Sequence, residues 1–326
     1  MSNLVTIFGG SGFVGRYIAR RMAKEGWRVR VAVRRPNDAL FVRPYGVVGQ
    51  VEPVFCNIRD DESVRAVTKG ADVVVNCVGV LAEDGKNTFD AVQAEGAGRV
   101  ARIAAEESVQ RMVQISAIGA DADSDSEYAQ SKAEGEEAVL AAFPTAMILR
   151  PSIVFGPEDE FFNRFASMTR FGPVLPVVGA DTKFQPVYVD DVAQAAVKGI
   201  LGQAEPGIYE LGGPDVRTFR ELMTEMLSVI HRKRLVLNIP FFAAGIMAKL
   251  MELGQTLSLG IVPAQITTDQ VANLRNDNVV SEGAKTLADL GIEPTTTASV
   301  LPSYLWRFRP SGQYYDITES AKTLRN

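Results

Sequence analysis

The sequence predicts an α/β fold in which a doubly wound parallel sheet is joined to a smaller C-terminal lobe. Within the first 150 residues, short apolar runs rich in β-branched residues alternate with longer segments of helical periodicity. Runs of this kind are typical of parallel strands that are covered by helices on both faces. After Arg150 the alternation is interrupted by five prolines between positions 151 and 186, which indicates a differently built second part.

The predicted elements follow one another in a regular order. Strands are predicted at 5–8, 29–33, 54–58, 72–77, 112–116 and 146–149. Helices are predicted at 14–25, 62–69, 88–107, 128–142, 191–201 and 219–230. We therefore expect a first domain over 1–155, to which 185–212 returns, and a smaller lobe over 156–326.

Composition excludes several classes of function. The 34 basic and 39 acidic residues among 326 give a net charge of −5, so there is no overall basic field to attract nucleic acid. The two cysteines, Cys56 and Cys77, lie in no metal-binding spacing, and His231 is the single histidine. We expect no nucleic acid partner and no metal, and we assign His231 no role.

Neither a signal peptide nor a membrane span is predicted. The first apolar run, 4–8, is too short for the core of a secretory signal, so we expect the mature protein to start at residue 1. The charge-free stretches 235–248 and 253–268 are interrupted by proline and polar residues and fall short of the roughly 18 apolar residues that spanning requires. The chain is therefore expected to be soluble or to lie on a surface.

A glycine-rich turn directly after the first strand predicts a dinucleotide site. The turn and the first helical residues read Gly9, Gly10, Ser11, Gly12, Phe13, Val14 and Gly15. Gly9 permits a tight turn, Gly12 permits a close approach of the pyrophosphate, and Gly15 permits close packing of the helix. Because a strand precedes it and a second strand follows, the motif predicts a Rossmann domain with cofactor contacts along 9–15.

Two arginines at the end of the second strand indicate NADPH. Sites selective for NAD usually carry an acidic residue there, which binds the ribose 2′-hydroxyl. Here the strand ends in Arg34 and Arg35, which suit a 2′-phosphate. The alternative is that one or both arginines are ordinary solvated surface charges.

Further cofactor contacts are expected where later strands end at the same edge of the sheet. These positions are Asn57 and Ile58 after the third strand, and Cys77, Val78, Gly79 and Val80 after the fourth. Ordinary strand ends are the competing interpretation.

A tyrosine and a lysine one helical turn apart complete the predicted site. Tyr128 and Lys132 are spaced i and i+4 after the fifth strand, so they share one helix face. The ammonium can then lower the pKa of the phenol and make it a usable acid or base. A contact with the cofactor and a catalytic role are both compatible with this pair.

Taken together, these motifs resemble the extended short-chain dehydrogenase/reductase superfamily over about the first 215 residues. The resemblance implies cofactor contacts at Ser116, Pro151 and Ile153 as well. Catalytic members carry a serine or threonine two residues beyond the position of Ser116, where it helps to hold the substrate oxygen. This chain has Ile118 there, so turnover would need Ser116 or Ser152 as a substitute.

A second segment is similar to one particular branch of that superfamily. The run 158–173, followed by 185–189, resembles the NADPH-binding alpha-subcomplex subunit nine family of respiratory complex I, in a bacterial form. The resemblance implies a tightly bound NADPH, docking beside the quinone-binding region and no independent turnover. It also implies a peripheral position on the cytoplasmic face of the bacterial inner membrane.

An amphipathic segment in the second half is consistent with such docking. The basic run 231–234 precedes a stretch, about 238–262, whose apolar face is rich in Phe, Ile, Met and Leu. A helix buried in the smaller lobe is the competing interpretation. Two other functions remain open, an NADP-dependent reductase or isomerase of a small or isoprenoid-like substrate and a nucleotide-sensing regulator.

Overall fold

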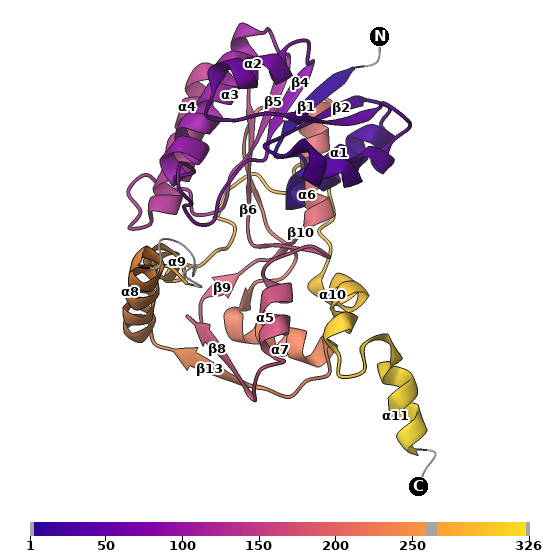
Figure 1. Cartoon of the computed structure of the whole chain (residues 1–326), viewed down its shortest axis with the longest axis vertical. Coiled ribbons are helices and arrows are strands. Elements are labelled where there is room, and N and C mark those ends of the chain that lie inside the picture. The colour runs from indigo at the N-terminus through magenta and orange to yellow at the C-terminus, as the bar shows by residue number, and fades with distance from the viewer. Residues whose placement is uncertain (1–2, 258–265, 324–326) are drawn as a thin grey trace. The chain divides into compact units, whose positions relative to one another are not determined.

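The computed structural model describes residues 3–257 and 266–323 of the chain (Figure 1). Its contacts divide the chain into two compact units. Unit 1 comprises 1–152, 189–212 and 280–294, and unit 2 comprises 153–188, 213–279 and 295–326. The chain therefore crosses between the units several times, and the segment 280–294 lies in unit 1 although it is distant in sequence from the rest of that unit. The predicted bounds of 1–155 and 156–326 divide the chain differently and stay a prediction.

Unit 1 is built on a parallel sheet of seven strands in the order β3-β2-β1-β4-β5-β6-β11. The strands are β1 (Leu4–Phe8), β2 (Arg28–Val33), β3 (Val51–Phe55), β4 (Val73–Asn76), β5 (Arg111–Ile115), β6 (Met147–Pro151) and β11 (Gly207–Leu211). The order reverses direction at β1, so that β1 and β4 lie side by side although two strands separate them in the chain. This is the doubly wound arrangement, and the predicted fold class is confirmed.

Helices cover both faces of this sheet. They are α1 (Phe13–Lys24), α2 (Asp61–Thr68), α3 (Glu95–Glu106), α4 (Glu127–Ala142) and α6 (Val189–Ile200), with a 3₁₀ segment η1 (Pro36–Tyr45) and a π-helical turn η2 (Asp90–Ala94). In Figure 1, α2, α3 and α4 lie on one face, and α1 lies beside α6 on the other. The Arg21 guanidinium joins α1 to α6 by two hydrogen bonds to Asp190, of 2.7 and 2.8 Å.

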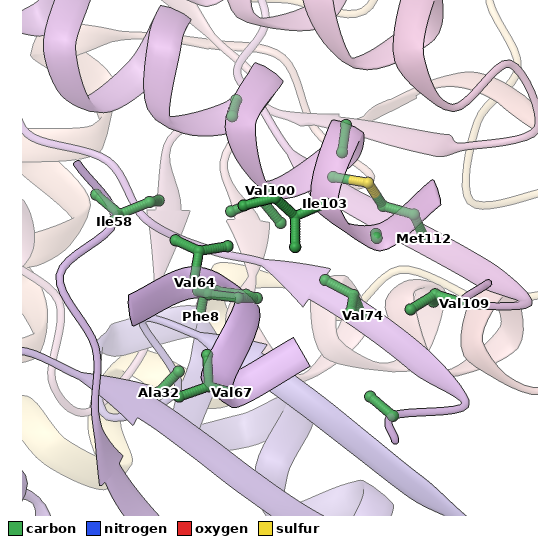
Figure 2. Packing of buried hydrophobic residues seen from close by; sticks show 14 of the residues in the cluster. Phe8, Ala32, Ile58, Val64, Val67, Val74, Val100, Ile103, Val109 and Met112 are labelled. Atoms are coloured by element: carbon green, nitrogen blue, oxygen red, sulfur yellow. The ribbon is translucent and has the colours of Figure 1, made fainter. Parts of the chain in front are cut away.

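The core under α2 and α3 is made of apolar side chains at helical and strand spacing (Figure 2). Val64 of α2 and Val100 and Ile103 of α3 are fully buried in one cluster with Phe8 of β1 and Val74 of β4. Burial of each such side chain contributes roughly 1.5–3 kcal/mol to folding. The packing fixes the strand ends, from which the candidate site projects.

One predicted strand was placed wrongly. The third strand covers Val51–Phe55, whereas 54–58 was predicted. Pro53 lies inside it, and proline disfavours a strand assignment except at a sheet edge. Since β3 is the edge strand of the sheet, the proline is accommodated, and Asn57 and Ile58 lie beyond the strand.

Unit 2 contains short paired strands and helices around an aromatic core. The strands pair as β7 (Val154–Phe155) with β10 (Val187–Tyr188), β8 (Val174–Val178) with β13 (Leu235–Ile239), and β9 (Lys183–Phe184) with β12 (Arg217–Thr218). The helices are α5 (Phe162–Met168), α7 (Phe219–Val229), α8 (Phe241–Leu257), α9 (Thr268–Asn273), α10 (Thr297–Leu305) and α11 (Tyr315–Thr323), with 3₁₀ turns η3 (Trp306–Phe308) and η4 (Gly312–Tyr314).

The phenylalanine-rich run that carries the second resemblance lies in this core. The ring of Phe161 packs 5.4 Å from that of Phe219, and Phe162 is fully buried. Asp159 is buried beside them, where its carboxylate accepts hydrogen bonds from the Tyr304 hydroxyl and from the amide of Asn163. Burial raises the pKa of Asp159 above its usual range. This run therefore has a structural role in the core of unit 2.

The predicted amphipathic segment corresponds in its described part to α8. Its small residues Ala244 and Ala248 are buried against Val178 and Val271. Its large apolar side chains Phe242, Ile246, Met247, Leu250 and Leu253 are exposed. Among the described residues, no helix combines the length and apolarity that crossing a bilayer requires. Positions 258–262 of the predicted segment lie outside the described residues.

Candidate functional site

The glycine turn lies at the carboxyl end of β1, and its glycine positions leave little room for a side chain. Gly9 adopts φ 72°, a conformation that favours glycine, and its carbonyl accepts a 2.9 Å hydrogen bond from the Gly12 amide. A side-chain carbon at Gly15 would lie 2.4 Å from the Gly9 carbonyl oxygen. Gly15 therefore has the packing role that the motif predicts.

The N-terminus of α1, which follows this turn, is open to an anion. Gly12 is its N-cap, no side chain caps the helix there, and the first turn contains no acidic residue. The first amides of a helix lack intrahelical partners and carry a partial positive charge. Ser11, Phe13 and Val14 border this end and are at most partly buried, so a pyrophosphate could approach it.

Arg34 and Arg35 follow β2, and both side chains are exposed. Arg35 lies 3.9 Å from the Asp38 carboxylate, a distance at the outer limit of an ion pair. Exposed pairs of this kind contribute little, so the arginines can reorient toward a ligand. Their contact with a 2′-phosphate stays a prediction.

The end of β4 meets the glycine turn. A side-chain carbon at Gly9 would lie 3.2 Å from the Cys77 carbonyl and 3.2 Å from a methyl of Val78. The Val78 amide donates to the Asn76 side chain, which shapes the chain as it leaves the strand, and Val80 is half-buried behind it. Burial raises the pKa of the Cys77 thiol to about 12, which disfavours the reactive thiolate form.

Lys132 lies buried near the carboxyl edge of the sheet, and its ammonium forms no hydrogen bond with any of the described side chains. It is 7% exposed, and its Nζ lies 5.8 Å from the centroid of the Tyr128 ring. Burial lowers the pKa of Lys132 to about 8, although the Glu136 carboxylate acts in the opposite direction. Tyr128 is half-buried and packs edge-to-face on Phe89 at 5.8 Å. The two predicted residues are thus together, with the ammonium over the ring.

Gln93 belongs to this site and was missed by the sequence reasoning. Its side chain is buried, its Nε2 donates to Ser131, and its Oε1 has no hydrogen-bond partner among the described residues. A side-chain carbon at Gly79 would lie 3.4 Å from this oxygen and 3.2 Å from Lys132 Nζ. A buried amide oxygen without a partner costs free energy unless a ligand or water satisfies it. Gln93 lies in the π-helical turn η2, a feature often found at functional sites.

A buried network of charges supports the same helix face. Glu136, one turn after Lys132, accepts three hydrogen bonds from Arg150, at 2.9, 3.1 and 2.6 Å, and one from Ser116. Arg150 also lies 3.5 Å from Glu210 of β11. The network therefore orients the Ser116 hydroxyl, which donates its hydrogen bond to the Glu136 carboxylate. Glu136 could have been noticed from its i+4 spacing to Lys132, whereas nothing local in the sequence marks Arg150 or Glu210.

The remaining residues predicted to contact the cofactor lie in different parts of the structure. Asn57 lies in the loop after β3, and Ile58 is buried in the core under α3. Pro151 ends β6 in unit 1, whereas Ile153 belongs to unit 2. Ile118 is buried, and its amide donates to the Pro151 carbonyl at 3.0 Å. The position that would carry a hydroxyl therefore has an aliphatic side chain.

The fold and the glycine-turn site define a class of protein. The model of the NAD dependent epimerase/dehydratase family matches residues 5–212, and the chain belongs to this family. Uncapped amides at α1, two exposed arginines and an unsatisfied Gln93 oxygen beside Lys132 fit a bound dinucleotide. In the described part of the chain, no group of His, Cys, Asp and Glu side chains is arranged to bind a metal ion.

Individual relatives are more specific. The chain is 34% identical to "NADH dehydrogenase (ubiquinone) 1 alpha subcomplex subunit 9, mitochondrial" of Arabidopsis thaliana, over 98% of this chain and 81% of that protein. It is 33% identical to a ceramide reductase of Caulobacter vibrioides, over 73% of this chain and 74% of that protein. The solved UDP-glucose 4-epimerase of Thermus thermophilus shares the fold with a TM-score of 0.69 and 19% identity, covering 94% and 99% of the two chains.

Proposed function

We propose that the protein is an accessory subunit of NADH:quinone oxidoreductase that holds a tightly bound NADPH without turning it over. The observation that carries the proposal is the similarity to the complex I subunit of Arabidopsis, which extends over 98% of the chain and so includes unit 2. The absence of a hydroxyl at position 118 supports it, because a catalytic phenol needs a second donor on the substrate oxygen.

In this proposal, residues of unit 1 hold the nucleotide. The amides at the start of α1 would receive the pyrophosphate, and Arg34 and Arg35 the 2′-phosphate. Lys132 and the Gln93 oxygen would bind hydroxyls of the nicotinamide ribose, which would satisfy both buried groups. When bound, NADPH can supply a hydride. The proposed role uses instead the stability that any ligand specific for the folded state adds by mass action.

A reductase is the second candidate. Tyr128 and Lys132 are both present and adjacent, and the similarity to the ceramide reductase covers 73% of the chain. In that case Tyr128 would donate a proton to the substrate oxygen, Lys132 would lower its pKa, and Ser116 or Ser152 would orient the substrate. The Ser116 hydroxyl already donates to Glu136, which disfavours this role for it.

The similarity to complex I subunits supports a proposal for the location of the protein. We propose partners among the complex I subunits near the quinone site, and a peripheral position on the cytoplasmic face of a bacterial inner membrane. The exposed apolar face of α8 is consistent with such docking.

The decisive experiment is to purify the native protein from solubilised membranes. We expect it to co-purify with NADH:quinone oxidoreductase and to carry NADPH. A protein found only as a free species that oxidises NADPH with an added carbonyl substrate would contradict the accessory role. Tyr128→Phe separates the candidates further, since it should leave quinone reduction by the complex unchanged but abolish a reductase activity.

Cofactor choice has its own test. Replacing Arg34 and Arg35 together by Ala should remove most of the preference for NADPH over NADH in a calorimetric titration. Arg20→Ala, an exposed arginine on α1, is the matched control and should leave the preference intact. Equal affinity of the unaltered protein for the two nucleotides would contradict the assignment.

A further inference from the structure

A basic groove lies in unit 2, in a segment that the nucleotide site does not use. Residues 231–236, the last turn of α7 and Tyr315 of α11 line a cavity of about 790 Å³, and none of its lining residues is acidic. His231 adopts φ 54° and closes the turn after α7. Its ring stacks on that of Tyr315 at 4.3 Å, so the stacked rings form one wall.

The cations of the groove are oriented by the backbone. Arg232 Nε donates to the Phe308 carbonyl at 2.8 Å, and Arg234 Nε donates to the Thr169 carbonyl at 3.0 Å. These bonds fix both guanidiniums and leave further N–H groups on each. Lys233 lies between them in the chain and is exposed.

No carboxylate of the described residues forms an ion pair with Arg232, Lys233 or Arg234. Burial lowers the pKa of Arg232, and the neighbouring charges of Arg234 and Arg170 lower it further. The groove thus concentrates positive charge within a protein whose net charge is −5. Basic residues at a helix C-terminus are favoured by the helix dipole, but that effect does not require three of them next to an open cavity.

Exposed apolar side chains continue from the groove along β13. Leu235 is 64% exposed and Leu237 49%, and Leu235 pairs with Val174 of β8, which is 38% exposed. Positive charge beside exposed aliphatic side chains matches a molecule with an anionic head and an apolar body. A nucleic acid would instead need a longer basic track with free aromatic faces, and here the two rings stack on each other.

We propose that this groove binds the phosphate of an anionic phospholipid, with Leu235 and Leu237 against the adjoining acyl region. The proposal rests on the peripheral membrane position proposed above, and it adds a defined headgroup site at 231–236. Lys233 is the residue to test, because its side chain has no hydrogen-bond or ion-pair partner in the described structure that the fold would lose.

The experiment measures sedimentation of the full-length protein with vesicles of phosphatidylglycerol and phosphatidylcholine, against phosphatidylcholine alone. We expect binding only to the anionic vesicles, and about fivefold weaker binding for Lys233→Gln. Lys233→Arg should restore it. Lys69→Gln, an exposed lysine of unit 1, is the matched control and should bind as the unaltered protein does.

Several results would overturn the proposal. These are equal binding of Lys233→Gln and the unaltered protein, equal binding to neutral vesicles, or stronger binding to single-stranded RNA than to anionic vesicles. Displacement from vesicles by inorganic phosphate as effective as that by a short-chain phosphatidylglycerol would identify a free-phosphate site instead. Co-purification with NADH:quinone oxidoreductase is measured for the unaltered protein and for the same variants. If the unaltered protein does not co-purify, the result contradicts the proposed function and leaves the lipid site to be judged from vesicle binding.

Discussion

Two regions of the described chain differ in how their positively charged side chains are compensated. In unit 1, Arg150 is largely buried and is held by two carboxylates, Glu136 and Glu210. In unit 2, the run 231–234 lies along an open groove, and no carboxylate of the described residues pairs with its arginines and lysine. A buried charge must be compensated within the fold, whereas an exposed one is stabilised by water and stays available to a partner.

Lys132 departs from this rule. It is buried in unit 1, and the Glu136 carboxylate, which raises its pKa against the effect of burial, is already bonded to Arg150 and Ser116. Among the described residues, Arg150 is paired with carboxylates at this edge, whereas the Lys132 ammonium forms no ion pair and the Gln93 Oε1 accepts no hydrogen bond. This contrast supports the proposal that both groups contact the bound nucleotide.

The largest effect is expected from breaking the buried pair. Glu136→Ala leaves Arg150 with only a long contact to Glu210, and removal of one partner from a buried pair costs about 3–5 kcal/mol. Denaturant unfolding measures this loss. Glu106→Ala, which removes an exposed carboxylate bonded to Arg65 and Arg102, should leave the unfolding midpoint nearly unchanged because water screens the pair. Equal losses for the two variants would contradict the contrast.

Two glycines, Gly15 of unit 1 and Gly172 of unit 2, differ in the space around them. Gly15→Ala would press a methyl against the Gly9 carbonyl, and overpacking of this kind costs about 1–3 kcal/mol. Nucleotide retention should fall with stability, because α1 must move away from the turn. Gly172→Ala in unit 2 meets no atom within 4 Å and serves as the control. A Gly15→Ala protein of unchanged Tm and unchanged bound nucleotide would refute the packing role.

A smaller effect of opposite sign is expected at Lys132. The folded state releases the Lys132 proton near pH 8 and the unfolded chain near 10.5, so the unfolded state binds more protons between these values. Stability of the nucleotide-free protein should therefore rise with pH from about 8 to 10.5. Lys132→Met removes this rise and should stabilise the nucleotide-free protein at pH 7 by about 1–2 kcal/mol.

The same Lys132→Met protein should retain nucleotide poorly. Denaturant titrations at pH 7 and pH 10, on nucleotide-free protein, measure both the offset and the slope. A variant that is less stable than the unaltered protein at pH 7 would show that the ammonium is compensated by the fold, and the assignment of Lys132 to a ligand would lose its physical basis.

The smallest effect on stability belongs to the exposed run. Lys233→Gln should change the free energy of unfolding by less than about 0.5 kcal/mol, since the side chain is exposed and forms no ion pair with the described residues. Thermal unfolding checks this value on the protein used for vesicle binding. A larger loss would mean that the run stabilises the end of α7 and is not reserved for a partner.

Much of unit 1 could be predicted from the sequence because its signals are local. Fully apolar strands such as 5–8 and the glycines that follow them depend on neighbours within a few residues, and the doubly wound sheet follows from their order. The strand predicted at 54–58 was wrong because Pro53 argues against a strand at the residues where β3 begins. The proline is acceptable only because β3 lies at the edge of the sheet, which is a tertiary feature.

Other features depend on contacts that no local pattern reveals. Gln93 faces the site because η2 is π-helical, and this wider turn changes which side chains share a face. Arg150 and Glu210 meet across adjacent strands that are distant in the chain, and Tyr315 reaches His231 from another helix of unit 2. Helical periodicity at 241–253 predicted α8 but could not tell that its large side chains would be exposed.

The edge strand β3 has a consequence for the behaviour of the protein at high concentration. The Cys56 amide donates to Val33, and the Gln50 carbonyl accepts from Val29, so both groups point toward β2. Pro53 lies an odd number of residues from each, and its nitrogen therefore points to the open side of the sheet. An open strand edge is a template for pairing between molecules, and a proline there removes a hydrogen-bond donor from that template. Pro53 therefore disfavours edge-to-edge pairing of β3 with another molecule, although Phe55 beside it is 62% exposed.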